Sequence, residues 1–366
     1  MRGDRRMNKL MRCAAACTAV LLFAACSAKS EKPSAASQSR SGAPTGQSEL
    51  APAAKDPIVI KIGHEQTIES NSHKAFEKFE ELVEAGSKGQ ISVEIMPNAQ
   101  LGNENDLVEG VKMGTLHMSV PSAGALSRFY APFSVFMVPY YLDGSGEAEQ
   151  YQNLVKIANS EVGEQINNGL IEATGMRALD IAQWYGNRNI TSNVPIRKPE
   201  DLKGIRIRTP DAPVNTEPMK ACGAAVTPMA FGEVYMALSQ GVIDAQENPN
   251  IVIFNKKFYE VQKYLSLSGH ISQNQVVIIN EAFFQSLTPE QQELLQGAMK
   301  EADVYASELQ VKENNDILDT MAGMGIEIIR DVDVAAFKEA TSSVANVILD
   351  EEGLALLEKV REVQKS

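Results

Sequence analysis

The chain has 366 residues, of which 44% are hydrophobic, and its 47 acidic and 34 basic residues give a formal net charge of -13 at pH 7. Nucleic-acid binding requires a basic surface that neutralises phosphates, so this charge argues against a nucleic-acid partner. The length is sufficient for two domains, each with a core of its own.

Residues 1–25 are predicted to be a secretory signal peptide. A basic segment of twelve residues precedes an eleven-residue apolar run from Cys13 to Phe23, and small residues follow that run. A transmembrane anchor is the weaker alternative, because spanning a bilayer takes roughly 20 apolar residues. Since residues 1–25 carry five positive charges and one negative charge, the remainder of the chain has a formal net charge of -17.

The predicted signal ends in the sequence LFAACS, which resembles the lipobox of bacterial lipoproteins. The resemblance implies that Cys26 receives lipid and becomes the new N-terminus, although Phe23 stands where the pattern usually has leucine. Residues 26–55 are rich in Ser, Ala, Pro and Gly and lack an apolar period, so we predict a disordered linker. Acyl chains on Cys26 would then tether the folded part to a membrane. Ordinary cleavage near Ala25, without lipid, is the alternative.

The four cysteines leave no scope for a disulfide in the folded part. Cys13 and Cys17 belong to the predicted signal peptide, and Cys26 is the lipidation candidate. Only Cys222 remains, and we expect it to be a small buried residue. The four histidines are scattered without the spacing of metal ligands. We therefore expect no metal site and no cofactor.

From residue 56 onwards, apolar periodicity predicts alternating strands and helices. The first half has strands at 56–63, 90–97 and 116–122, separated by helices at 70–89 and 105–114. The order strand, helix, strand, helix, strand indicates an α/β unit with a parallel sheet.

A second, smaller α/β unit is predicted downstream, followed by one further strand and a long helical stretch. The helical stretch begins with Thr288 as its cap and Pro289 as its first residue, a combination typical of helix starts. The predicted elements of this half are strands at 204–210, 242–249 and 270–283, and helices at 215–224, 230–241 and 288–325.

Polar residues lie at the carboxyl ends of several predicted strands, where open α/β sheets bind ligands. Glu65 follows the first strand, Ser122 ends the third, Arg208 ends the strand at 204–210, and Asn248 follows VIDAQE. Each could singly be a surface or loop-capping residue, but together they favour a ligand-binding cleft between two lobes. The chain has no His-Glu-x-x-His, Gly-x-Ser-x-Gly, Walker or Cys-x-x-Cys motif, so no catalytic residue is predicted.

The segments RTP and GAAVTPMAFGEVYMALSQGVIDAQENP resemble the DctP-type solute-binding proteins of tripartite ATP-independent periplasmic (TRAP) transporters. The upstream segments SNSHKAFEKFEELVE and IMPNAQLGNENDLVEGVKMGTLHMSVPS agree with this resemblance. It implies a two-lobed, periplasmic-binding-protein-like α/β fold with crossing hinge strands and a long helix spanning both lobes. We expect lobe I to comprise residues 56–183 and 274–313, and lobe II to comprise residues 184–273 and 314–366.

The resemblance also implies the positions of the ligand contacts. The family's carboxylate-binding arginine falls on Arg208, and a second basic residue falls on Arg188. The asparagine of the Gln-Glu-Asn-Pro motif falls on Asn248, and an aromatic wall for the carbon skeleton falls on Phe231. Arginine suits this role because its guanidinium group forms two parallel hydrogen bonds with a carboxylate.

The other end of the expected cleft differs from that of sialic-acid-binding members. Glu65, Ser122 and Ala125 stand where those members have Asn, Glu and Arg, so we do not expect sialic acid. The Glu65 carboxylate accepts hydrogen bonds from hydroxyl groups and would repel a second ligand carboxylate. It therefore favours a sugar acid over a plain dicarboxylate.

The leading hypothesis is an exported, lipid-tethered receptor that binds an organic acid and performs no chemistry. Binding would shift the two lobes toward a closed state. The resemblance implies that the receptor delivers its ligand to the small and large membrane subunits of a TRAP permease. One alternative is a receptor that presents its ligand to a signalling partner. Another is an enzyme on the same scaffold, which would need a nucleophile or an acid–base pair in the cleft.

Overall fold

A computed structural model describes residues 57–365, so the predicted signal peptide, Cys26 and the predicted linker lie outside the described residues. Nine strands in this part of the chain form one mixed sheet with the order β2-β1-β3-β8-β4-β7-β5-β6, and β9 pairs with β8. The strands are β1 (Ile58–Gly63), β2 (Ile91–Met96), β3 (Met118–Ser119), β4 (Met176–Ser192), β5 (Arg206–Thr209), β6 (Ala225–Pro228), β7 (Ala245–Pro249), β8 (Tyr264–Asn280) and β9 (Glu327–Ile329).

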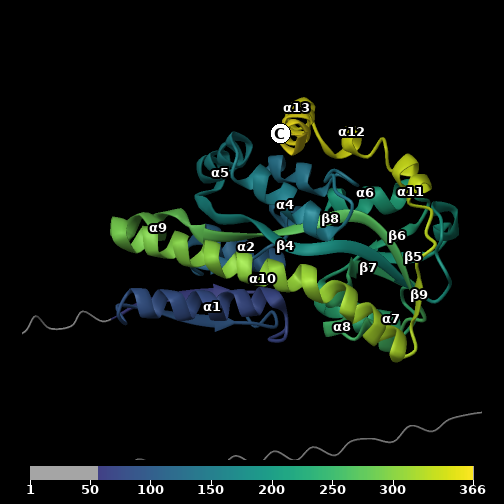
Figure 1. The fold of residues 1–366 in the computed structure, drawn as a ribbon, viewed down its shortest axis with the longest axis horizontal. Helices are drawn as coiled ribbons and strands as arrows, with labels where there is room; N and C mark the ends of the chain where they lie inside the picture. The colour runs from purple at the N-terminus through teal and green to yellow at the C-terminus, as the bar shows by residue number, and fades with distance from the viewer. Residues whose placement is uncertain (1–56, 366) are drawn as a thin grey trace, which may run out of the picture. The chain divides into compact units, whose positions relative to one another are not determined.

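Two long antiparallel strands, β4 and β8, cross the middle of the sheet (Figure 1). On one side β8 pairs with β3, which leads to the parallel strands β1 and β2. On the other side β4 pairs with β7, which leads to the parallel strands β5 and β6. The sheet therefore contains two parallel groups joined by crossing strands, which confirms the predicted α/β class.

The sequence predicts the two crossing strands incompletely. The strand predicted at 270–283 extends back to Tyr264, and β4 is not predicted at all. No residue of either strand is exposed, so the alternation that marks a half-buried strand is absent. The strand predicted at 116–122 is reduced to the two residues of β3. Ser122 makes an isolated bridge to Gln275, and α3 begins directly after it.

Helices alternate with the strands, as an α/β fold requires. No helix within residues 57–365 combines the length and the apolar character needed to cross a membrane. The α-helices are α1 (Asn71–Gly86), α2 (Glu104–Met113), α3 (Ala123–Leu126), α4 (Glu147–Ala158), α5 (Glu161–Thr174), α6 (Pro213–Ala221), α7 (Val234–Ser239), α8 (Asn250–Asn255), α9 (Glu281–Ser286), α10 (Pro289–Gly323), α11 (Val334–Ala340), α12 (Ala345–Ile348) and α13 (Glu351–Lys365). Short 3-10 helices are η1 (Ala131–Met137), η2 (Pro199–Leu202), η3 (Phe231–Glu233) and η4 (Phe258–Glu260).

The helices α1 and α10 form where local signals predict them. On α1, the apolar stripe of Phe76, Phe79 and Val83 is fully buried. The 35-residue helix α10 begins at Pro289, and the side chain of Thr288 accepts a hydrogen bond from its first turn. This helix packs against α1 and β4 and, further along, against α8 and β9 (Figure 1). It therefore passes both parallel groups of strands, as the family resemblance implies.

The C-terminal helix α13 packs on elements from the first half of the chain. Its residues Leu356 and Val360 share a hydrophobic cluster with Leu154 of α4 and Leu170 of α5. Residues 314–366 are predicted to belong to lobe II, whereas α4 and α5 lie within the residues predicted for lobe I. The boundaries of both lobes stay a prediction.

Candidate ligand-binding site

One cavity, with a volume of about 380 Å³, is lined by residues from both parallel groups of strands. Its wall contains residues of the β1–α1 loop, the N-terminal ends of α2 and α3, and β4, β5, η3, β7 and β8. All six ligand contacts predicted from the sequence line this cavity: Glu65, Ser122, Arg188, Arg208, Phe231 and Asn248.

Arg208 supplies an unpaired positive charge to the cavity. Its side chain is 3% exposed, and its Nε and Nη2 donate to the Met229 carbonyl oxygen at 3.0 and 2.6 Å. No residue between 57 and 365 accepts from its Nη1 or forms an ion pair with it. Burial and the charge of Arg188 lower the pKa of Arg208 to about 10, so it is protonated at neutral pH. By contrast, Arg206 is exposed and pairs with Asp244 at 2.6 Å.

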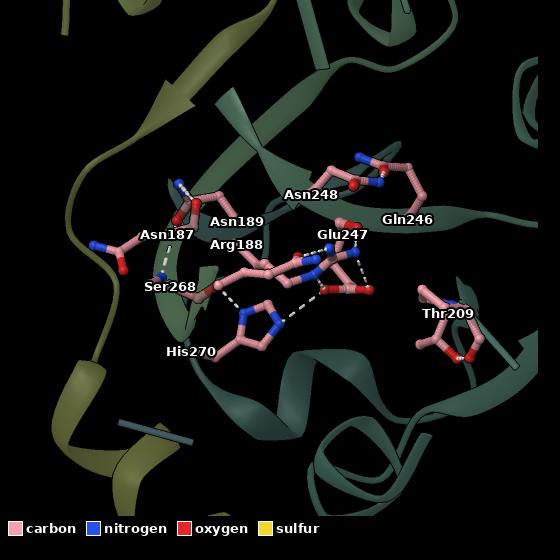
Figure 2. A network of polar contacts seen from close by, with 12 residues as sticks. Asn187, Arg188, Asn189, Thr209, Gln246, Glu247, Asn248, Ser268 and His270 are labelled. Carbon is pink, nitrogen blue, oxygen red and sulfur yellow. Dashed lines mark hydrogen bonds and ion pairs between the residues drawn. The ribbon is translucent and has the colours of Figure 1, made fainter. Parts of the chain in front are cut away.

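Arg188 also lines the cavity, but its charge is already neutralised within the protein (Figure 2). Its Nε donates to the carboxylate of Glu247, and its Nη2 donates to Glu247 Oε1 at 2.7 Å and to the Glu247 carbonyl oxygen at 2.5 Å. Its Nη1 donates to Gln273 Oε1. Arg188 therefore lines the cavity as half of a buried ion pair, whereas Arg208, which has no ion-pair partner among residues 57–365, is available to an anionic ligand.

Two buried polar side chains, His270 and Ser268, extend the hydrogen-bond network of Glu247 (Figure 2). His270 Nε2 lies 3.2 Å from Glu247 Oε2, and Ser268 Oγ lies 2.8 Å from His270 Nδ1. Burial by itself would raise the pKa of Glu247, but the charge of Arg188 and the hydrogen bonds from Arg188 and His270 lower it to about 2. Glu247 is therefore a carboxylate at neutral pH, and the pair it forms with Arg188 is neutral overall.

Phe231 and Asn248 form further parts of the cavity wall. The Phe231 ring is half-buried, with the Arg208 guanidinium carbon 5.8 Å from its centroid and Lys256 Nζ 4.8 Å from it. Asn248 is buried, and its Nδ2 donates to Gln246 Oε1 at 2.6 Å. An apolar face and an oriented amide thus lie near the free guanidinium group.

Two carboxyl groups, Glu65 and Glu104, lie in another part of the wall. The backbone N–H of Glu104 donates to Glu65 Oε1 at 2.9 Å, and the backbone N–H of Ser122 donates to Glu104 Oε1 at 2.5 Å. Burial and the nearby charge of Glu104 raise the pKa of Glu65 to about 7. Burial also raises the pKa of Glu104. The Ser122 hydroxyl oxygen caps α3 by accepting from the Ala125 N–H at 3.1 Å.

The family described as bacterial extracellular solute-binding protein, family 7 (DctP) matches residues 62–352. The chain belongs to this family. Its relatives in the family include the 2,3-diketo-L-gulonate-binding periplasmic protein YiaO of Escherichia coli, which is 34% identical over 310 residues, or 83% of this chain and 92% of the relative. The C4-dicarboxylate-binding periplasmic protein DctP of Rhodobacter capsulatus is also 34% identical, over 75% of this chain and 80% of the relative.

A solved structure of a TRAP periplasmic solute-binding protein has the same fold. The TRAP periplasmic solute-binding protein from Roseobacter denitrificans with bound L-galactonate superposes with a TM-score of 0.77. It is 31% identical in sequence, and the match covers 83% of this chain and 99% of that chain. These matches confirm the family that the sequence resembles and the two-lobed fold class predicted from it.

Two carboxylates of the site were not predicted from the sequence. Glu104 is the first residue of α2, where acidic side chains commonly serve the helix terminus. Glu247 lies beside Asn248 in the QENP motif, and on a strand such neighbours point to opposite faces. The alternation on β7 could therefore have indicated that Glu247 faces away from Asn248, toward another partner.

Proposed function

We propose that the protein captures an organic acid in this cavity, with the ligand carboxylate bound by Arg208. One observation carries the proposal. Arg208 is a buried cation that lines the cavity, has an N–H without an acceptor, and has no carboxylate partner among residues 57–365. A buried charge is costly unless it is paired, so a ligand carboxylate is the group that would complete this site.

The preferred ligand class is a sugar acid. The cavity is at the small end of the range for ligand pockets, and polar side chains such as Glu65, Asn215 and Gln275 line it. These groups suit hydroxyls along a short carbon chain, and Phe231 offers the apolar contact. The diketogulonate-binding and galactonate-bound relatives have ligands of this chemistry, which supports the same class here.

The proposal includes delivery of the ligand to the small and large membrane subunits of a TRAP permease, which membership of the family supports. Lipid attachment at Cys26 is part of the proposal and rests on the LFAACS sequence. Wild-type protein expressed in a bacterial host should fractionate with membranes, whereas Cys26→Ala should be released. Wild-type protein that fractionates without membranes would contradict the lipid anchor and leave the binding proposal intact.

Binding without catalysis is favoured over an enzymatic function. Ser268, His270 and Glu247 form a hydrogen-bonded chain that superficially resembles a hydrolase triad. Each of these three residues is at most 1% exposed, and none of them lines the cavity. A substrate in the cavity therefore has no access to the Ser268 hydroxyl, and His270 serves to position Glu247.

A thermal-shift screen over sugar acids, dicarboxylates, keto acids and aromatic acids tests the proposal. A ligand at 100 times its dissociation constant should stabilise the protein by about 2.7 kcal/mol. Arg208→Ala should abolish the shift, whereas Arg206→Ala, on the same strand but outside the cavity, should retain it. An equal shift from the amide or methyl ester of the hit, or a hit that Arg208→Ala leaves unchanged, would contradict the carboxylate assignment.

A further inference from the structure

Glu65 and Glu104 place two carboxyl groups side by side in the cavity wall. Glu65 Oε1 accepts a hydrogen bond from the backbone N–H of Glu104 at 2.9 Å. Glu104 Oε1 in turn accepts one from the backbone N–H of Ser122 at 2.5 Å. Glu65 Oε2 has no hydrogen-bond partner among residues 57–365. Both residues line the cavity, so the pair can meet a ligand directly.

The charged groups around this pair do not neutralise it. Arg208 and Lys256 act on Glu65, and Arg188 and Arg208 act on Glu104, but none of these cations forms an ion pair with either carboxyl group. Arg188 is neutralised by Glu247, as shown above. Arg208 is the proposed partner of the ligand carboxylate, and Lys256 lies over the Phe231 ring with its Nζ 3.5 Å from the Glu65 carbonyl oxygen. Tyr185, also buried in the wall, is neutral at physiological pH because burial raises its pKa.

We propose that Glu65 and Glu104 determine specificity by admitting acids with a single carboxylate and a hydroxyl group at the other end, and by rejecting dicarboxylates. The inference rests on the proposed function, because it assumes that Arg208 binds the first carboxylate. A hydroxyl group can donate to a carboxylate of the pair or accept from a protonated one. A second ligand carboxylate would instead meet like charge in a partly desolvated site.

Protonation of the pair gives this discrimination a pH dependence. Burial and mutual repulsion favour a bound proton, and the pKa of Glu65 is about 7. As the pH falls below this value, the pair loses negative charge and gains a hydrogen-bond donor. The affinity for a dicarboxylate should therefore rise relative to that for the matching monocarboxylate.

Calorimetric titration with two matched pairs of acids tests the inference. Galactonate and galactarate, like erythronate and meso-tartrate, have equal chain lengths and differ in whether the far end is a hydroxymethyl or a carboxylate group. At pH 7.5 the wild-type protein should bind the monocarboxylate of a pair at least about 100-fold more tightly. Glu65→Gln and Glu104→Gln should each reduce this ratio at least about tenfold, and lowering the pH to 5.5 should reduce it for the wild-type protein.

Glu69→Gln is the matched control, because Glu69 is an exposed acid in the same loop as Glu65. This substitution should leave the ratio of monocarboxylate to dicarboxylate affinity unchanged. Melting temperatures without ligand establish that each variant is folded. If dicarboxylates bind as tightly as monocarboxylates through Arg208, this inference is wrong and the proposed function stands. Unchanged ratios in both Gln variants would also overturn it. If no acid binds in an Arg208-dependent way, the proposed function fails and this inference fails with it.

Discussion

The substitution Glu247→Gln removes the charge that neutralises Arg188 while nearly preserving the side-chain volume. Both side chains are 2% exposed, so the Arg188 guanidinium would be left buried without its counter-ion. Breaking a buried ion pair by removing one partner destabilises a protein by about 3–5 kcal/mol. We expect the variant to lose stability of this order at neutral pH.

The lowered pKa of Glu247 corresponds to a contribution of similar size to the free energy of unfolding. Its value falls from the ordinary 4.5 to about 2 in the folded state, and each pKa unit corresponds to about 1.4 kcal/mol. The folded protein therefore gains about 3 kcal/mol from this ionisation at neutral pH. Because the folded-state pKa is lowered, this stability is present above pH 4.5 and is lost as the pH falls toward 2.

Urea unfolding at pH 7 and thermal melting between pH 3 and 7 measure both effects. At about 2 °C per kcal/mol for a protein of this size, the variant should melt about 6–10 °C lower at pH 7. The difference in melting temperature between the variant and the wild-type protein should become smaller at acid pH. Asp244→Asn is the control, because it removes the carboxylate from an exposed pair with Arg206. Equal losses of stability in Glu247→Gln and Asp244→Asn would refute the reasoning.

Substitutions test three other parts of the structure. Asp303 is buried beside a second aspartate with its Oδ1 unpaired among the described residues, and its pKa is raised. The raised pKa means that ionisation of Asp303 is unfavourable in the folded protein, so the folded state loses stability as the pH rises. Asp303→Asn should therefore increase the melting temperature at pH 8 but not at pH 4. Arg128 and Asp211 form an exposed ion pair beside the cavity. Replacing either residue with Ala should accelerate ligand release about 2–5-fold in stopped-flow measurements. The double variant should release the ligand little faster than either single variant. A Cβ on Gly163 would lie 2.2 Å from a backbone oxygen, so Gly163→Ala should lower the urea-unfolding free energy by about 1–3 kcal/mol.

Local sequence signals predict the elements that have a single buried face and a marked start or end. On α1 the apolar stripe predicts the buried side, and the Thr288–Pro289 pair predicts where α10 begins. Strand β4 has no such signal, since none of its residues is exposed and its partners lie far along the chain. Its existence depends on pairing with β7 and β8, which periodicity within a short window does not capture.

The candidate site shows the same division between local and tertiary information. Placement at strand ends and the family motifs predict six residues that line one cavity. They do not predict which charges are free, because that depends on the register of β4 against β7. In that register Arg188 lies opposite Pro249 and Ile190 lies opposite Glu247, so the Glu247 side chain comes within reach of the guanidinium group.

This pairing changes what the loss of Arg188 would mean. Two free guanidinium groups in one cavity would attract a dianion, whereas a neutral Arg188–Glu247 pair leaves Arg208 as the free guanidinium, which matches one carboxylate. Arg188→Ala would weaken binding and also leave the buried Glu247 carboxylate without its arginine counter-ion, so lost affinity in that variant does not assign a ligand contact. Glu247→Gln separates the two roles, because it frees the Arg188 charge without removing the side chain. If Arg188 acts by positioning the wall, Glu247→Gln should destabilise the fold while monocarboxylate binding still depends on Arg208.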